Sequence, residues 1–240
     1  MKKTALLLIF FFLPFCAKAL VTLNEDFSDG NYTDNPVWTG DYQSFAINAN
    51  LQLQTKNDNA ATCYLSTPFA INNNAVWEFF ARINNPTTQN NYLRFYFLSD
   101  NENPNNTQGC YVQIGGSKKN IQICQQNGEK HTTLLNVKNN CFVEDSIPYE
   151  GFIFNLKLQL TDNVLSVYFK NHNNTFYDFL GSCTIKPQYT EGGFLSLQIK
   201  HTKPNGYNYF FDDLHCEGEY EKPTVQTDTT DNPLPYTDSD

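Results

Sequence analysis

The stretch that decides the fold runs from Asn155 to Phe169 and reads NLKLQLTDNVLSVYF. Polar and apolar side chains alternate up to Leu160, a polar turn follows at residues 161–163, and the alternation resumes at Leu165. A period of two gives a β-strand one apolar and one polar face. The stretch therefore predicts an antiparallel hairpin with one buried face.

The same alternation recurs along the chain, and no stretch has convincing helical periodicity. Short strand-like segments are joined by Asn, Gly, Pro and Asp turns, which predicts an all-β sandwich or barrel. The other predicted strands are Leu23–Phe27, Phe45–Ile47, Leu51–Gln54, Thr62–Ser66, Val76–Ile83, Tyr92–Ser99, Gly109–Gly115, Asn120–Gln125, Thr132–Val137, Phe176–Cys183, Leu195–Lys200 and Asn208–His215.

Residues 1–19 have the pattern of a cleavable export signal. Lysines at positions 2 and 3 precede an apolar run, and Ala-Lys-Ala follows at positions 17–19. A membrane anchor is disfavoured because the run is about half the roughly 20 residues that a spanning helix needs. Lipidation at Cys16 is disfavoured by the bulky residues before it. The mature chain is predicted to start at Leu20 and to be periplasmic, surface-attached or extracellular.

The other end of the chain changes composition after Cys216. Residues 217–240 are rich in Asp, Glu, Thr and Pro, which is typical of an extended linker or tail. The sequence therefore predicts one globular domain over residues 20–216, followed by an acidic tail.

The charge of the chain disfavours a nucleic-acid partner. Lys and Arg number 16 against 25 Asp and Glu, giving a net charge of −9. Binding to nucleic acid needs clustered basic side chains, and the chain has two arginines, Arg82 and Arg94. No hydrophobic stretch after the signal approaches membrane-spanning length.

Six cysteines follow the signal, an even number that permits disulfides in an exported chain. Cys110 and Cys124 would be neighbours in a hairpin, but alternation places their thiols on opposite faces of the sheet. No CxxC pair is present, which disfavours zinc. The sequence leaves the pairing open.

Seven segments carry a resemblance to a known family. Taken in order, they resemble the N-terminal concanavalin A-like (lectin/glucanase superfamily) domain of bacterial lamin-tail-domain and related cell-surface proteins. The segments are EDFSDG (25–30), NPVWTGD (35–41), YLSTP (64–68), WEF (77–79), LSD (98–100), GCYVQIGG (109–116) and FFDD (210–213).

The resemblance implies a two-sheet antiparallel jelly-roll sandwich whose first and last strands pair. It also implies that the acidic tail links to further domains beyond Asp240.

A structural Ca²⁺ site is a further implication, because many lectin-like sandwiches hold this ion where the first and last strands meet. Carboxylates are available there, and Ca²⁺ prefers six to eight oxygen ligands. The candidate ligands are Glu25, Asp26, Asp29, Asp212 and Asp213. The alternative is that these acids form turns and are solvated.

Sequence evidence for catalysis is weak. Glycosidases of this superfamily place carboxylates at alternate positions of one strand, about 5 Å apart. The nearest match, EGEYE at 217–221, falls in the predicted tail. The chain has no GxSxG, HExxH or phosphate-loop motif.

A candidate ligand-binding face follows from alternation in four strands. If these strands are neighbours, as sequential strands often are, one outer face collects charged, amide and aromatic side chains that suit a sugar. The candidate residues are Glu78, Arg82, Arg94, Tyr96, Tyr111, Gln113 and Gln122. The alternative is a solvated face with a cross-strand pair of Glu78 with Arg82 or Arg94, contributing little.

Three functions are compatible with these observations. The leading hypothesis is a non-catalytic extracytoplasmic module that binds glycans or surface polymers. The second is a ligand-free spacer of a larger cell-surface protein, since a fold alone does not confer a function. The third is a glycoside hydrolase-like enzyme.

Overall fold

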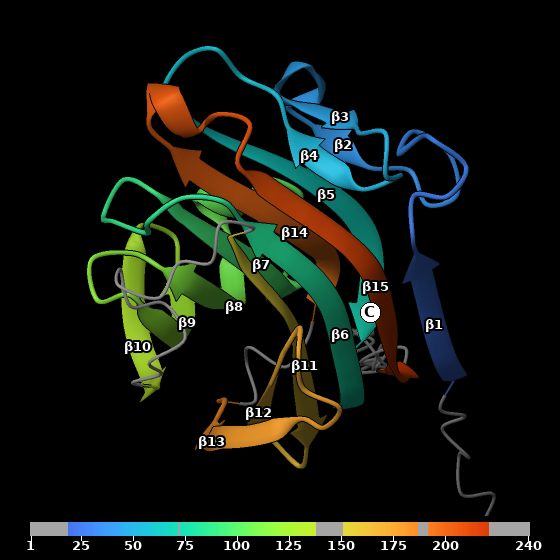
Figure 1. The fold of residues 1–240 in the computed structure, drawn as a ribbon. Helices are drawn as coiled ribbons and strands as arrows, with labels where there is room; N and C mark the ends of the chain where they lie inside the picture. Colours follow the sequence, from blue (N-terminus) through green and yellow to red (C-terminus); the bar gives the residue numbers. More distant parts are fainter. Residues whose placement is uncertain (1–18, 72, 138–150, 187–191, 221–240) are drawn as a thin grey trace, which may run out of the picture.

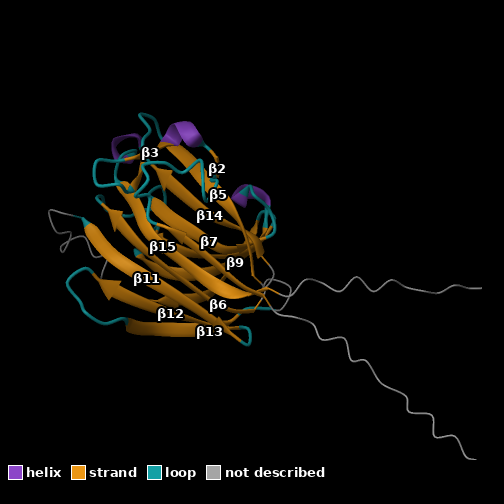
Figure 2. Ribbon diagram, turned by 90° about the vertical axis from the view of Figure 1, so that its right-hand side faces the viewer, coloured by secondary structure: helices purple, strands orange, loops and turns teal. Residues whose placement is uncertain are grey.

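The computed structural model describes residues 19–71, 73–137, 151–186 and 192–220. They form two antiparallel β-sheets packed face to face (Figures 1 and 2). The predicted all-β sandwich is confirmed.

Sheet A has the order β13-β12-β11-β6-β15-β4-β3, and β1 also pairs with β15. Its strands are β1 (Ala19–Glu25), β3 (Phe45–Ile47), β4 (Leu53–Thr55), β6 (Asn73–Ile83), β11 (Phe152–Thr161), β12 (Val164–Asn171), β13 (Asp178–Thr184) and β15 (Tyr209–Tyr220).

Sheet B has the order β10-β9-β8-β7-β14-β5-β2. Its strands are β2 (Thr39–Gly40), β5 (Ala61–Ile71), β7 (Tyr92–Ser99), β8 (Gln108–Gly115), β9 (Asn120–Asn127), β10 (Lys130–Val137) and β14 (Gly192–His201). Short 3₁₀ helices lie at Tyr42–Ser44, Pro104–Asn106 and Lys203–Asn205. None of the helices in the described ranges is long and apolar enough to cross a bilayer.

The predicted hairpin of residues 155–169 is the β11–β12 pair. Thr161 pairs with Val164, so the turn consists of Asp162 and Asn163 alone. Both turn residues have positive φ, 49° and 64°. A two-residue turn with two positive φ angles matches the twist of the flanking strands, and Asp and Asn tolerate this backbone better than most residues.

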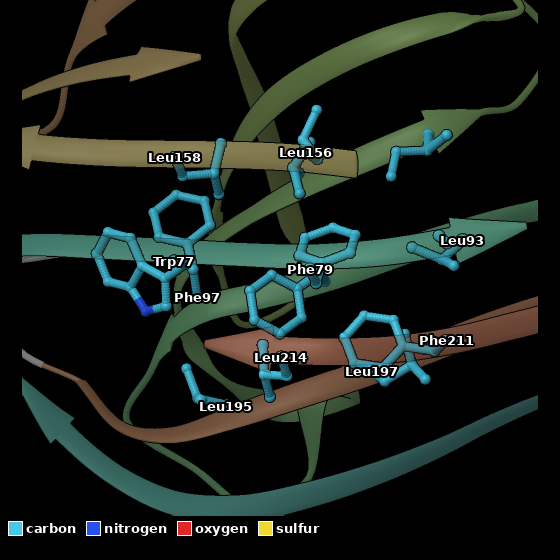
Figure 3. Packing of buried hydrophobic residues seen from close by; sticks show 14 of the residues in the cluster. Trp77, Phe79, Leu93, Phe97, Leu156, Leu158, Leu195, Leu197, Phe211 and Leu214 are labelled. Carbon is cyan, nitrogen blue, oxygen red and sulfur yellow. The ribbon is translucent and has the colours of Figure 1, made fainter. Parts of the chain in front are cut away.

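The core lies between the sheets and combines aromatic rings with Leu, Ile and Val side chains (Figure 3). The ring centroids of Phe79 from sheet A and Phe95 from sheet B are 4.8 Å apart. Trp77 packs in the same way on Phe97, at 5.1 Å. The inward-facing set predicted for β6 is fully buried, since Trp77, Phe79, Ala81 and Ile83 are all 0% exposed.

The first and last strands pair, as the resemblance implies, with Glu25 opposite Leu214. However, β15 continues past the predicted domain end at Cys216 to Tyr220. Glu217 and Glu219 therefore lie in a strand, and their prediction as tail residues is wrong. The strand persists here because its backbone pairs with both β1 and β6, which outweighs an acidic composition.

The prediction that β6 and β7 are neighbouring strands of one sheet is wrong. Strand β6 pairs with β11 and β15 in sheet A, whereas β7 pairs with β14 and β8 in sheet B. Residues 84–91 carry the chain from one sheet to the other, because both strands have a strongly apolar face that the shared core can bury. Their polar faces consequently point away from each other, on opposite sides of the sandwich.

The predicted separation of Cys110 and Cys124 is confirmed. Cys110 lies in the core between the sheets, and Cys124 packs with two tyrosines on the outer side of sheet B. The five cysteines in the described ranges are free thiols. Cys141 lies outside those ranges.

Candidate functional site

The outer side of sheet B is a polar and aromatic surface, here called the Arg94 face. Its side chains alternate with core residues on β14, β7, β8 and β9 and so point away from the core. The Arg94 face consists of Tyr92, Arg94, Tyr96, Tyr111, Gln113, Gln122, Gln126, Ser196, Gln198 and Lys200.

Arg94 is the centre of this face. Its Nε donates to Gln113 Oε1 at 2.9 Å, and its Nη1 donates to Gln198 Oε1 at 3.3 Å. The guanidinium carbon is 4.6 Å from the ring centroid of Tyr92 and 4.7 Å from that of Tyr111. The half-buried cation is thus held by neutral amides and ring faces from three strands, which favour its charged form.

Two buried tyrosines form the floor beneath Arg94. Tyr96 is 0% exposed and Tyr111 is 2% exposed, and their ring centroids are 4.8 Å apart. The Tyr96 hydroxyl donates to Gln126 Oε1 at 2.8 Å. Burial raises the pKa of Tyr96 to about 12. These rings therefore shape the face without being accessible themselves.

The β7–β8 connection, residues 100–107, covers one end of the face. Its Asn105 Oδ1 accepts from Gln198 Nε2 at 2.9 Å, and its Pro104 carbonyl accepts from Gln126 Nε2 at 3.0 Å. The Glu102 carbonyl accepts from Ser66 Oγ at 2.6 Å. Gln198 and Gln126 are therefore buried, and the accessible part of the face is Arg94 with Tyr92, Gln113 and Lys200.

Gln122, another predicted ligand residue, lies toward the edge of the face on β9. Its Nε2 donates to Asn136 Oδ1 at 3.2 Å, and its side chain is 7% exposed. It belongs to the same face as Arg94 but contributes little accessible surface.

Glu78 and Arg82 lie on the opposite side of the sandwich, on the outer side of sheet A. The guanidinium carbon of Arg82 is 3.8 Å from the ring centroid of Phe210. Glu78 accepts a hydrogen bond from the Tyr177 hydroxyl. The predicted seven-residue face is therefore two faces, and a Glu78–Arg94 pair is ruled out by the sheet order.

The β1–β15 junction holds a separate cavity of about 400 Å³. The predicted ligands Glu25, Asp26, Asp29 and Asp213 line it. Asp212 lies next to Asp213, and burial raises its pKa to about 6. The prediction that acidic residues from the first and last strands lie close together is thus correct.

These acids do not fit a Ca²⁺ site as the chain arranges them. Both oxygens of Glu25 already accept hydrogen bonds, Oε1 from Phe27 N at 2.8 Å and Oε2 from Trp38 Nε1 at 3.3 Å. Asp26 and Asp29 accept from backbone N–H groups two residues further on. Across the described ranges, no three His, Cys, Asp or Glu side chains are grouped to hold a metal ion.

The sequence prediction did not include five residues of the Arg94 face, namely Tyr92, Gln126, Ser196, Gln198 and Lys200. Alternation in Leu195–Lys200 already places Gln198 and Lys200 outward, but only the sheet order shows that β14 lies beside β7. Tyr92 begins its strand two residues before Arg94 and shares its face. The contact of Asn105 depends on a loop path that no sequence pattern reveals.

No protein-family model and no curated protein sequence matches the chain. Solved structures with a similar fold include a carbohydrate-binding module, CBM66, from Bacillus subtilis, with a TM-score of 0.55 and 12% identity. That match covers 75% of this chain and 95% of the module.

Two further solved structures are also similar. The exoplasmic/lumenal domain of VIP36, in a form with Ca²⁺ and Man2 bound, gives a TM-score of 0.59 at 9% identity, covering 85% of this chain and 90% of that domain. Metal-free lectin I-B4 from Griffonia simplicifolia gives 0.56 at 11% identity, covering 84% and 99%. The chain therefore has a concanavalin A-like fold. Its resemblance to lamin-tail-domain proteins stays a prediction.

Proposed function

We propose that the chain is a non-catalytic extracytoplasmic module that binds a glycan through the Arg94 face. The observation that carries the proposal is the arrangement of Arg94, which is fixed by hydrogen bonds to Gln113 and Gln198 and contacts the rings of Tyr92 and Tyr111. The neighbouring folds, which include lectins and a carbohydrate-binding module, support the same class of ligand.

The chemistry of the accessible part of the face suits a sugar. Guanidinium and amide groups hydrogen-bond hydroxyls, and a half-exposed tyrosine ring such as Tyr92 packs on the apolar face of a pyranose. Because Arg94 and Gln113 are already oriented by hydrogen bonds, little side-chain entropy is lost when the ligand binds.

The arrangement of carboxylates supports a non-catalytic role. Glu217 and Glu219 occupy alternate positions of β15, as a glycosidase pair would. However, Glu219 accepts from Asn74 Nδ2 at 3.0 Å, and neither residue lines the cavity at the β1–β15 junction.

The proposed binding does not depend on Ca²⁺. Glu25, Asp26 and Asp29 serve their own turns and Trp38, and the Arg94 face has no acidic member. Calcium and a chelator should therefore leave glycan binding unchanged.

A glycan array probed with the mature chain from Leu20 tests the proposal. Binding to a defined glycan set, lost in Tyr92→Ala and kept in Tyr168→Ala on the other sheet, would support it. Absence of binding to any glycan would favour the spacer function. Hydrolysis of a bound glycan would contradict the non-catalytic role.

A further inference from the structure

The charge distribution around Arg94 is unusual for a chain with a net charge of −9. In the part of the chain that the structure describes, no carboxylate forms a hydrogen bond or ion pair with Arg94. Its contacts are Gln113, Gln198 and the tyrosine rings. Burial acts to lower the pKa of Arg94, but the oxygens of Tyr111, Tyr96 and Tyr92 outweigh it, so the pKa is raised and the cation persists.

Other cations flank the same face. Lys200 Nζ is 6.0 Å from the ring centroid of Tyr92, the ring that Arg94 also contacts. The exposed Lys118 lies near enough to Cys124 to act on the pKa of that thiol. Arg94, Lys200 and Lys118 thus lie on this side of sheet B, whereas Asp41 and Glu102 lie nearer Tyr64 of β5 and four carboxylates line the cavity at the β1–β15 junction.

The partners of Arg94 also leave some N–H donors of its guanidinium group available to a ligand. Two of its N–H groups donate to Gln113 and Gln198, and the Tyr96 hydroxyl is also within hydrogen-bonding reach. A guanidinium carries five donors in one plane, so two remain for a ligand. A carboxylate matches this planar geometry and can accept two N–H groups at once. A hydroxyl group does not match the planar guanidinium in this way and carries no charge. A neutral sugar would therefore leave the positive charge of Arg94 uncompensated.

We propose that the Arg94 face selects a carboxylate-bearing sugar, a uronic acid unit within an acidic polysaccharide, with the carboxylate on the Arg94 guanidinium. This inference rests on the proposed glycan-binding function and names its ligand class. The ring of Tyr92 then takes the apolar face of the sugar, and Gln113 lies beside its hydroxyls. General ion exchange does not account for such binding, because the chain and the polymer carry the same sign of charge.

Affinity electrophoresis with EDTA present tests this proposal. The gels contain polygalacturonate, alginate or hyaluronan, each paired with its methyl-esterified form, which keeps the sugar backbone but removes the charge. We expect at least one acidic polymer to retard the wild-type chain and its ester to bind at least about tenfold more weakly. Arg94→Gln should abolish the retardation, and Arg82→Gln should leave it unchanged.

Control variants and outcomes separate this inference from the proposed function. Arg94→Lys keeps the charge but not the fork, so it should restore only part of the affinity. Equal retardation by an acid and its ester, or array binding confined to neutral glycans, would overturn the acidic specificity while leaving glycan binding intact. Absence of binding to every glycan would overturn both.

Discussion

The two arginines of the chain stand on opposite outer faces of one sandwich. Arg94 is joined to Gln113 and Gln198 across three strands of sheet B, and the β7–β8 connection covers one end of its face. Arg82 stacks on Phe210 in sheet A, where its strand neighbours include Ile153. Alternation predicts both side chains to point outward, but the order of strands decides what surrounds them.

Removal of a buried aromatic floor should have the largest effect. Tyr96→Ala deletes a ring that is 0% exposed and the hydrogen bond to Gln126, so we expect a loss of about 3–5 kcal/mol in the free energy of unfolding. Tyr168→Ala on sheet A, whose half-buried ring contacts Phe179, should cost less than half as much. Urea unfolding measures both. Equal losses of stability in the two variants would show that the buried Tyr96 ring does not support the Arg94 face.

Removal of Gln126, which anchors the β7–β8 connection, should have the next largest effect on stability. Gln126 donates to the carbonyls of Pro104 and Gly128, at 3.0 and 2.9 Å, and accepts from Tyr96. Gln126→Ala leaves these buried groups without a partner, and we expect destabilisation of about 2 kcal/mol. The matched control, Gln159→Ala, changes an exposed glutamine on sheet A and should lie within about 0.5 kcal/mol of the wild type.

A smaller effect concerns the pH dependence of stability and, unlike the two effects above, arises on sheet A. On sheet A, burial raises the pKa of Asp212 from 3.8 to about 6. The folded state therefore keeps a proton that the unfolded chain has lost, and stability falls as the pH rises from about 4 to about 6.

Asp212→Asn should remove this loss, because asparagine stays neutral and can still accept from Asp213 N. Solvent screening of the half-exposed group limits the gain in melting temperature to roughly 2 °C at pH 7. The melting temperatures of the variant and the wild type should converge at pH 4. A constant difference across this range would contradict the assignment.

The smallest effect is expected from calcium. Because Glu25, Asp26 and Asp29 already accept hydrogen bonds from their own turns, thermal melts with Ca²⁺ and with EDTA should superimpose. An ion bound only to the folded state would raise the melting temperature in proportion to the logarithm of its concentration. Such a rise would show that the β1–β15 junction rearranges around the ion.

Local pattern predicted the strands and the faces of the sheets well. Alternation correctly buried Trp77 and Phe79 and separated Cys110 from Cys124, because a side chain's face depends on its own strand. It failed where pairing over long sequence distances decides. Alternation alone does not show that β6 and β7 belong to different sheets, so it predicts Glu78 and Arg82 on the face of Arg94. The acidic composition after Cys216 predicts a tail, because it does not show that β15 pairs there with β1 and β6.

The central claim is that the two arginines differ in function because they lie on different sheets. Isothermal titration of a glycan that binds the wild-type chain, repeated on Arg94→Gln and Arg82→Gln, tests it most directly. We expect a Kd raised at least about tenfold for Arg94→Gln and unchanged for Arg82→Gln, with both variants melting within a few degrees of the wild type. Binding that survives Arg94→Gln, or is lost in Arg82→Gln, would contradict it.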